Sequence, residues 1–429
     1  MNYPVWDIPY LGGSSIIAGI AILHVLIAHF AVGGSLFLVL TERKAYREND
    51  PRVLAFVRRD SLLFLLITLV LGAVTGVGIW FAIGLVNPSA TSALIHIFVW
   101  AWAIEWVFFL VEVTAALVYY YGWDRMDRAT HLKVGWIYYG AAWMSLAVIN
   151  GILTFMLTPG QWVQTQSFWD GFFNPTYLPS LCWRTVITFA LTSLYAMAAA
   201  ELIREPDFRA KMVHYAARWM IPAFFLMPLC GLWYFSQMPL LAREIAAGGA
   251  PAVTIFLAFS ALLSLLIFAF AYFGPFRHPE TFSMPFALLI LLLGFLVTGM
   301  AEWVREAVRK PYIIYDYMYA NAIRVDDVDR IRAEGVLASA KWSLVREQDG
   351  ADDIRVGREV FRVQCQSCHT VVGYNGINLL VKGWPPEVTE VQLRHLDTLK
   401  GFMPPFLGND AERRALTAWL CSLDRRGGP

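Results

Sequence analysis

The segment SSIIAGIAILHVLIAHFAVGGSLFLVL, residues 14–40, contains no Asp, Glu, Lys or Arg. A helix rises 1.5 Å per residue, so about 20 apolar residues are enough to cross the hydrocarbon core of a bilayer. Further largely apolar segments of sufficient length lie at 61–86, 92–121, 134–157, 180–203, 217–236, 252–273 and 283–305. We therefore predict an all-α, polytopic bundle of about eight transmembrane helices over residues 1–310.

The composition agrees with a membrane protein. Apolar residues make up 58% of the 429 residues and charged residues 16%, and the charges are concentrated in the loops and the C-terminal part. The opening residues, MNYPVWDIPYLGG, lack the basic stretch of a cleavable signal peptide, so we expect the first apolar segment to be retained as a helix. No basic stripe with interleaved aromatic residues is present, so nucleic acid is not an expected partner and membrane lipid is.

The distribution of basic residues between loops predicts the orientation. The loops after the odd-numbered helices contain Arg43, Lys44, Arg47, Arg52, Arg58, Arg59, Arg125, Arg128, Lys133, Arg204, Arg209, Lys211, Arg218 and Arg277. Between the membrane segments, the opposite side has only Arg243. Cytoplasmic loops carry the excess of Lys and Arg. We therefore expect a multi-pass protein of a bacterial inner membrane, with both chain ends in the periplasm.

The chain changes character after the last apolar segment. A connector is predicted at 311–349, beginning with the Tyr-rich string YIIYDYMY (312–319), and a small helical domain is predicted at 350–429. This domain contains Cys365-Gln366-Ser367-Cys368-His369, a CxxCH motif. In such motifs the two thiols bond covalently to a haem, and the histidine is one axial iron ligand.

A second axial ligand is predicted at Met403, within GFMPPF (401–406), where two prolines restrict the chain. His/Met ligation raises the haem potential. The closing AERRALTAWLCSLD (411–424) indicates an amphipathic helix that covers the haem, and residues 350–426 resemble a class I cytochrome c. The alternatives are a chance CxxCH, a metal site or a disulfide pair. The predicted periplasmic location, where c-type haem is attached, favours the haem.

Ionisable residues in membrane helices are costly and are functional candidates. Glu105 and Glu112 lie on one helix face, as do Glu302 and Glu306, and Arg305 and Arg309 lie beside the latter pair. His24 and His29 are turned about 140° apart, so they cannot both face one cofactor. The remaining candidates are His96, on the side opposite Glu105, and Arg184, near the outer end of its helix.

Residues 10–320 resemble subunit I of the cytochrome bd oxidases. The strings that carry the resemblance are LHVLIAHFAVGG (23–34), GAVTGVG (72–78), AIEWVFFLVEV (103–113) continuing to GWDRM (122–126), HLKVGW (131–136), FNPTYLP (173–179) and EAVRKPY (306–312). The resemblance implies that His24 and Glu306 bind two high-spin haems, b or d, near the outer face. It also implies that Glu105 lies at the oxygen-reducing haem and Glu112 in a proton path, and that a second membrane subunit or larger respiratory complex is a partner.

The sequence also departs from that family. The low-spin haem ligand of the family falls at Trp183 or Arg184, neither of which is a plausible ligand, and the seventh segment has no Met for the other side of that haem. The quinol-binding loop is reduced to about 237–252. Quinol remains a possible donor, but the departures indicate that the electron entry has changed.

Structural roles compete with the functional ones. His24 could pack helices, Glu306 could face water, and Glu112 could pair with a subunit or water. His29 and His96 could be structural or could bind an additional haem b. Arg184 is expected to pair with a haem propionate or a Glu.

The leading hypothesis is a respiratory haem oxidoreductase that passes electrons between the periplasmic c haem and membrane haems, and that reduces oxygen when fed by a periplasmic electron carrier such as cytochrome c. The alternative is a non-catalytic electron-transfer subunit, or a quinol dehydrogenase, that links the membrane to periplasmic cytochromes. Enzyme activity, the direction of electron flow and the number of membrane haems stay open at this level.

Overall fold

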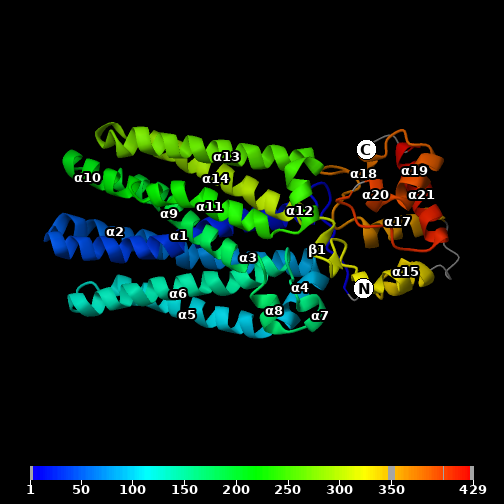
Figure 1. Ribbon diagram of the computed structural model, residues 1–429, viewed down its shortest axis with the longest axis horizontal. Helices are drawn as coiled ribbons and strands as arrows, with labels where there is room; N and C mark the ends of the chain where they lie inside the picture. Colours follow the sequence, from blue (N-terminus) through cyan, green and yellow to red (C-terminus); the bar gives the residue numbers. More distant parts are fainter. Residues whose placement is uncertain (1–2, 346–352, 400, 426–429) are drawn as a thin grey trace.

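The computed structural model describes residues 3–345, 353–399 and 401–425. It contains a bundle of long helices that lie side by side and a smaller helical domain at one end (Figure 1). Within the described residues, eight helical segments are long and apolar enough to cross a membrane. The predicted all-α bundle with a small helical domain is therefore confirmed.

The bundle begins with one long helix and a second span of three consecutive helical pieces. The bounds of the bundle elements are α1 Gly13–Glu48, α2 Pro51–Leu66, η1 Ile67–Gly72, α3 Ala73–Val86, α4 Pro88–Ile97, α5 Val99–Tyr121, α6 Arg128–Phe155, α7 Trp162–Thr165, α8 Phe168–Phe172, α9 Tyr177–Ala200, α10 Pro206–Ala217, α11 Met220–Gln237, α12 Leu240–Glu244, η2 Ile245–Gly249, α13 Pro251–Ala271, η3 Tyr272–Phe276, η4 Pro279–Thr281 and α14 Met284–Ala307.

Two boundaries differ from the sequence-based expectation. The second span starts at Pro51 rather than at 61, because Pro51 suits the first helical position and Asp50 accepts a hydrogen bond from the Arg52 amide. The third span breaks at Phe98, where φ is −120° and ψ is 32°. The Phe98 ring is fully buried and makes an edge contact with Phe155. His96 therefore belongs to the short helix α4, apart from Glu105 on α5.

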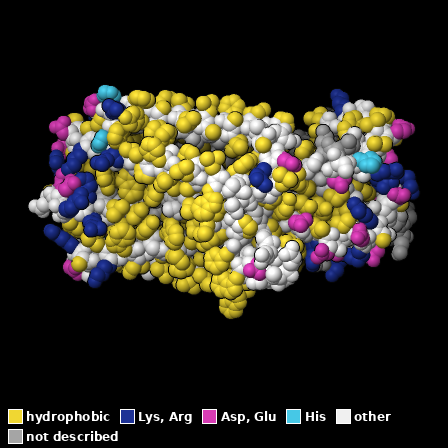
Figure 2. Space-filling model, in the orientation of Figure 1, with side chains coloured by type: hydrophobic (Ala, Val, Ile, Leu, Met, Phe, Trp, Pro, Cys, Tyr) yellow, Lys and Arg dark blue, Asp and Glu magenta, His cyan; other side chains and the backbone are white. Residues whose placement is uncertain are grey.

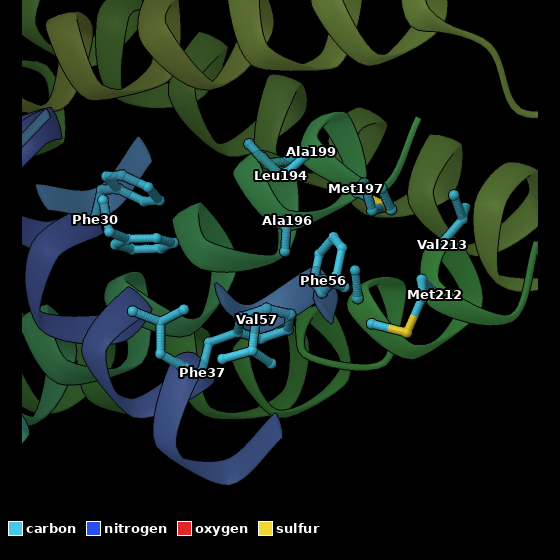
Figure 3. Packing of buried hydrophobic residues seen from close by; sticks show 14 of the residues in the cluster. Phe30, Phe37, Phe56, Val57, Leu194, Ala196, Met197, Ala199, Met212 and Val213 are labelled. Carbon is cyan, nitrogen blue, oxygen red and sulfur yellow. The ribbon is translucent and has the colours of Figure 1, made fainter. Parts of the chain in front are cut away.

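Helix α1 runs through the middle of the bundle and contacts α2, α3, α6, α9 and α14. Its Gly33 allows a close approach to α9, because a Cβ there would overlap the Thr188 carbonyl oxygen. Toward the Lys/Arg-rich end, a cluster of buried apolar residues from α1, α2, α9 and α10 fills the interior (Figure 3). It includes Phe37, Phe56, Met197 and Met212. This packing fixes α1, which carries His24 and His29.

Charge divides the molecule along its length. Lys and Arg gather at the end of the bundle where α2 and α10 begin, and an apolar surface separates this end from the C-terminal domain (Figure 2). We call these two ends the basic end and the domain end. The positions agree with the predicted orientation, in which the basic loops and the C-terminal domain lie on opposite sides of a membrane.

After the bundle, two strands pack on it through Ile314 and Met318, and the helices that follow surround a core of their own. All of these elements are short. They are β1 Tyr312–Ile314, β2 Met318–Tyr319, η5 Val325–Asp327, α15 Val328–Glu334, α16 Val336–Ser339, α17 Asp353–Gln364, α18 Ile377–Leu380, α19 Pro386–Arg394, α20 Leu396–Leu399 and α21 Asp410–Arg425. Helices α17 and α21 pack together, with the Phe361 and Trp419 rings 4.8 Å apart.

The connector contributes to this core. Val336, Leu337 and Ala340 are buried together with residues of α17 and α21. The Glu412 carboxylate accepts hydrogen bonds from the amides of Val336 and Leu337, each at 2.8 Å, at the N-terminus of α16. Residues 336–340 of the predicted connector are therefore packed as part of the C-terminal domain.

Candidate functional site

The CxxCH motif follows directly from the C-terminus of α17. The last helical turn continues through it, because the amide of Cys368 donates to the Cys365 carbonyl at 3.0 Å and the amide of His369 donates to the same oxygen at 2.8 Å. This turn places both thiols and the imidazole on one short stretch of chain. The described geometry fits a covalently attached haem with His369 as an axial ligand.

The His369 ring is prepared for metal binding. Its Nδ1 lies 3.2 Å from the Asn375 carbonyl, so Nδ1 carries the hydrogen and Nε2 presents a lone pair. Asn375 in turn donates to the Cys368 carbonyl at 2.8 Å, which ties this loop to the motif. Burial lowers the pKa of His369, which favours the neutral ring that can bind iron.

The segment between His369 and Met403 exposes large apolar side chains. Leu379, Leu380 and Phe402 are each at least 40% exposed, and such side chains are available to contact a haem. The loop of Met403 is fixed at its far end, because the Leu407 amide donates to the buried Gln364 amide oxygen on α17 at 2.9 Å. The proposal of Met403 as second axial ligand is compatible with this anchoring.

His24 faces the second span of the bundle. Its Nδ1 lies 3.0 Å from the Thr75 hydroxyl, and that hydroxyl is 2.6 Å from the Leu71 carbonyl. A hydroxyl has one hydrogen, which Thr75 gives to the carbonyl, so it accepts from His24 Nδ1. The Nε2 of His24 is thereby left with a lone pair, as a haem ligand requires. Gly76, which adds no side chain, lies beside the ring.

His29 and His96 differ in their surroundings. His29 is 3% exposed and its Nδ1 donates to the Val25 carbonyl at 2.7 Å. It lies within electrostatic range of Arg184 and Glu302. His96 is exposed at the domain end on α4, and its Nδ1 donates to the Ser92 carbonyl. Both residues stay candidates for haem b, and His29 is the one that lies inside the bundle.

A cluster of charged side chains lies near the domain end of α9 and α14. Glu302 pairs with Arg305 at 2.7 Å, and Arg184 lies within electrostatic range of both. No hydrogen-bond partner of the Arg184 side chain is found within the described part of the chain. The electrostatic interaction with Glu302 agrees with the expected pairing with a Glu, and pairing with a haem propionate stays a prediction. Trp183, at the other family ligand position, packs its ring edge-on against Tyr234.

Glu306 lies one turn further along α14. Its carboxylate contacts Arg309 and lies 3.5 Å from Lys310, and its side chain is 45% exposed. Arg309 itself is buried and also reaches the Met156 sulfur at 3.0 Å. Iron binding by Glu306 therefore requires its carboxylate to turn away from Arg309, and the ligand role stays a prediction.

Polar residues form a regular ladder between α5 and α6. Glu105, Glu112 and Tyr119 are seven residues apart on α5, and Ser145, Tyr138 and His131 are seven apart on α6, so each set lies on one face. The Ser145 hydroxyl donates to Glu105 at 2.8 Å. Tyr138 is buried within electrostatic range of Glu112, and the Tyr119 and His131 rings are 4.4 Å apart.

The basic end of this ladder contains a buried cluster that the sequence analysis missed. Glu42 is fully buried on α1 and accepts from the Tyr119 hydroxyl at 2.7 Å. His131 Nδ1 lies 2.8 Å from Glu42, and His131 Nε2 lies 2.9 Å from the Tyr119 carbonyl. A carbonyl only accepts, so Nε2 carries a hydrogen, and one further proton is shared between Nδ1 and Glu42. The sequence signal that could have indicated this cluster is the position of Glu42 just after the apolar segment 14–40.

The fold and these sites define a multi-span membrane protein with a cytochrome c-like domain at one end. The chain belongs to the cytochrome bd terminal oxidase subunit I family, whose profile matches residues 15–239. A second profile, cytochrome C oxidase, cbb3-type, subunit III, matches residues 352–420. Both resemblances expected from the sequence are thereby confirmed, and they show haem binding and a role in respiratory electron transfer.

Among solved structures, the chain is similar to the bd oxidase from Geobacillus thermodenitrificans, with a TM-score of 0.58 and 16% identity. The match covers 70% of this chain and 87% of that chain. At this identity the similarity shows the fold, and it supports the predicted bundle. No curated protein matches the chain.

Proposed function

We propose that the protein is a respiratory oxidoreductase in which electrons enter from a periplasmic carrier at the c haem of Cys365, Cys368 and His369 and pass to haems b or d in the membrane. Oxygen is the proposed acceptor. The observation that carries the proposal is the contact of the CxxCH motif with the first turn of α1, the helix on which the Nδ1 of His24 is engaged by Thr75. His24 and Glu306 would hold the membrane haems, with Arg184 at a propionate.

The membrane haem would supply the redox chemistry, and the ladder between α5 and α6 would move protons. In this proposal His131 and Glu42 take up a proton at the basic end, and Tyr138, Glu112 and Glu105 hold it on the way to the outer half of the bundle. The 14 residues from Tyr119 to Glu105 span about 21 Å of α5. Buried waters would have to carry the proton between successive pairs of the ladder, which are Tyr119 with His131, Tyr138 with Glu112, and Glu105 with Ser145.

The proposed sidedness follows the positive-inside rule. The basic end lies in the cytoplasm, and the C-terminal domain lies in the periplasm of a bacterial inner membrane. A periplasmic cytochrome and a second membrane subunit are the proposed partners. The largely apolar outer surface of the bundle, including Phe225, Leu229 and Leu232 on α11, would face lipid or that subunit.

The test combines spectra with oxygen uptake. Reduced-minus-oxidised spectra of the purified protein should show b or d bands beside the c band, and carbon monoxide should shift one of them. Oxygen uptake should follow addition of reduced cytochrome c. A preparation with haem c but no haem between the helices would exclude the proposal, as would failure of every donor to support oxygen uptake in the intact complex.

One observation favours the alternative of a quinol-linked relay. A cleft of about 400 Å³ at the domain end is lined by Phe173, Tyr177, Trp233 and Gln237 among others. Aromatic walls with the two amides of Asn174 and Gln237 suit a quinone ring. If quinol reduces the c haem but no carbon monoxide-reactive haem is present, the relay is the correct function.

A further inference from the structure

The N-terminal segment before α1 lies against the loop that follows the CxxCH motif. The Tyr374 amide donates to the Tyr10 carbonyl at 2.6 Å, and Tyr10 and Gly373 form an isolated parallel β-bridge. On the first turn of α1, the Ser14 hydroxyl donates to the carbonyl of Ser367 at 3.2 Å. Ser367 lies between the two haem-binding cysteines, so this contact reaches the motif itself.

Gly373 leaves no space between the two chains. Its φ is +100°, and a Cβ at this position would lie against the Tyr10 carbonyl oxygen and 2.6 Å from the Tyr10 Cα. The atoms on the other side belong to the backbone, so they cannot turn away as a flexible side chain would. The close approach therefore depends on a glycine at position 373.

The same segment is attached to the bundle. The Trp6 amide donates to the Leu85 carbonyl at the end of α3 at 3.0 Å. Gly13, the first residue of α1, packs directly on the Val86 side chain. Residues 6–14, which we call the strap, thus connect the outer ends of α1 and α3 to the haem-binding loop.

We propose that the strap holds the c haem in one fixed position over the outer end of α1 and thereby sets the rate of electron transfer into the membrane. His24 follows Ser14 by ten residues on the same helix, about 15 Å along its axis. His369 would hold the electron donor and His24 the acceptor, and the transfer would move one electron from the first to the second without a proton. Tyr10, Ser14 and Gly373 are positioning residues for this step. The inference rests on the proposed function.

The domain is therefore not a free shuttle on a long tether. It is docked, and its soluble partner must approach from a side that the strap does not cover. The contact consists of hydrogen bonds between backbone groups and one hydroxyl. Because hydrogen bonds weaken steeply with distance and angle, a small displacement of the loop is enough to break it.

Gly373→Ala in the full-length protein tests the docking, with Gly383→Ala as its matched control. Both glycines have positive φ, +100° and +75°, and both lie in the C-terminal domain, but a Cβ at Gly383 meets nothing within 4 Å. We expect Gly373→Ala to lower the docked population about tenfold, which corresponds to about 1.4 kcal/mol. Hydrogen exchange of the Tyr374 amide should rise accordingly, and the control should not change it beyond a general strain effect.

The second readout is the rate at which an electron moves from the c haem to the membrane haems after rapid reduction. This fast phase should shrink in Gly373→Ala and persist in Gly383→Ala, while the haem c absorption spectrum stays the same in both. A variant lacking residues 3–11 removes the part of the strap that contains Trp6 and Tyr10, leaves the sequence of the C-terminal domain unchanged, and should lose the fast phase too.

The outcomes separate the two proposals. If the unchanged protein shows no membrane haem or no electron transfer to it, the proposed function fails, and hydrogen exchange still decides whether the strap docks the domain. If Gly373→Ala and the truncated variant both transfer electrons as fast as Gly383→Ala, the strap does not set the rate and the inference is wrong.

Discussion

Thr75 determines which nitrogen of His24 is available, although it is not itself a ligand candidate. Its single hydrogen is donated to the Leu71 carbonyl, so the hydroxyl oxygen accepts from His24 Nδ1. Groups that orient a metal-binding histidine in this way commonly change metal affinity by about 10- to 100-fold when they are removed.

We therefore predict that Thr75→Val lowers membrane haem affinity by about 10- to 100-fold. In the proposed function haem c is covalently attached, so the ratio of b or d haem to c haem in a pyridine haemochrome assay measures the effect. Thr298→Val is the matched control, because the hydrogen bond that Thr298 makes within the described residues goes to the Gly294 carbonyl of its own helix. An unchanged ratio in Thr75→Val, or an equal loss in the control, would contradict the prediction.

A second residue-scale prediction concerns pH. Burial alone would raise the pKa of Glu359, but hydrogen bonds from Arg362, the Leu344 amide and Ser343 lower it below its ordinary value overall. A lowered carboxyl pKa stabilises the folded state above the unfolded pKa of about 4.3, and this stabilisation is lost as pH falls through the folded value.

Denaturant unfolding of the C-terminal domain, followed by haem c absorbance, should thus require less denaturant at about pH 3.5 than at about pH 6. Glu359→Gln should reduce this difference, whereas Glu387→Gln, at an exposed position of α19, should retain it. Equal pH dependence in all three proteins would show that Glu359 does not contribute.

At the scale of the helices, α1 and α9 approach closely at Gly33, because this residue has no side chain that would separate them. Gly33→Ala would press a methyl group against the Thr188 carbonyl and the Thr192 hydroxyl. Such overpacking costs about 1–3 kcal/mol. Gly19→Ala, on the same helix with nothing within 4 Å, should cost little. Thermal unfolding in detergent, followed by circular dichroism, measures both variants, and similar midpoints would refute the close-packing argument.

The α5–α6 ladder leads to a prediction that depends on the proposed function. Glu112→Gln keeps the size of the side chain but removes its ability to carry a proton, so oxygen uptake should fall about 100-fold while the haem spectra remain unchanged. Glu244→Gln, on the exposed surface of α12, should leave uptake unaffected. Full activity in Glu112→Gln would exclude this residue from the proton route.

At the scale of the whole molecule, the proposed orientation places the basic end in the cytoplasm and the domain end in the periplasm. Asp124 at the basic end and Asp326 in the C-terminal part have side chains 72% and 76% exposed, which makes them a matched pair. With Cys182, Cys230 and Cys421 replaced by Ser, we expect a membrane-impermeant thiol reagent applied to the periplasmic side to label Asp326→Cys and not Asp124→Cys. The reverse pattern would overturn the orientation.

The sequence by itself determined the eight spans, their expected orientation and the haem c motif, because each is written in contiguous residues: apolar segments of bilayer length, loop charges, and Cys365 to His369. It also contained enough similar strings to indicate the family. The strong apolar signal could not locate the break at Phe98, however, because that break depends on aromatic rings from α6 and α8.

Only the tertiary structure decided which distant residues meet. Thr75 beside His24, Glu42 beside His131, and Tyr10 against Gly373 are contacts between elements far apart in the chain. A local pattern of hydrophobicity fixes which face of a helix is buried, but not which neighbour that face packs against. That choice is made when all the helices and the C-terminal domain pack together, since each contact depends on the positions of the others.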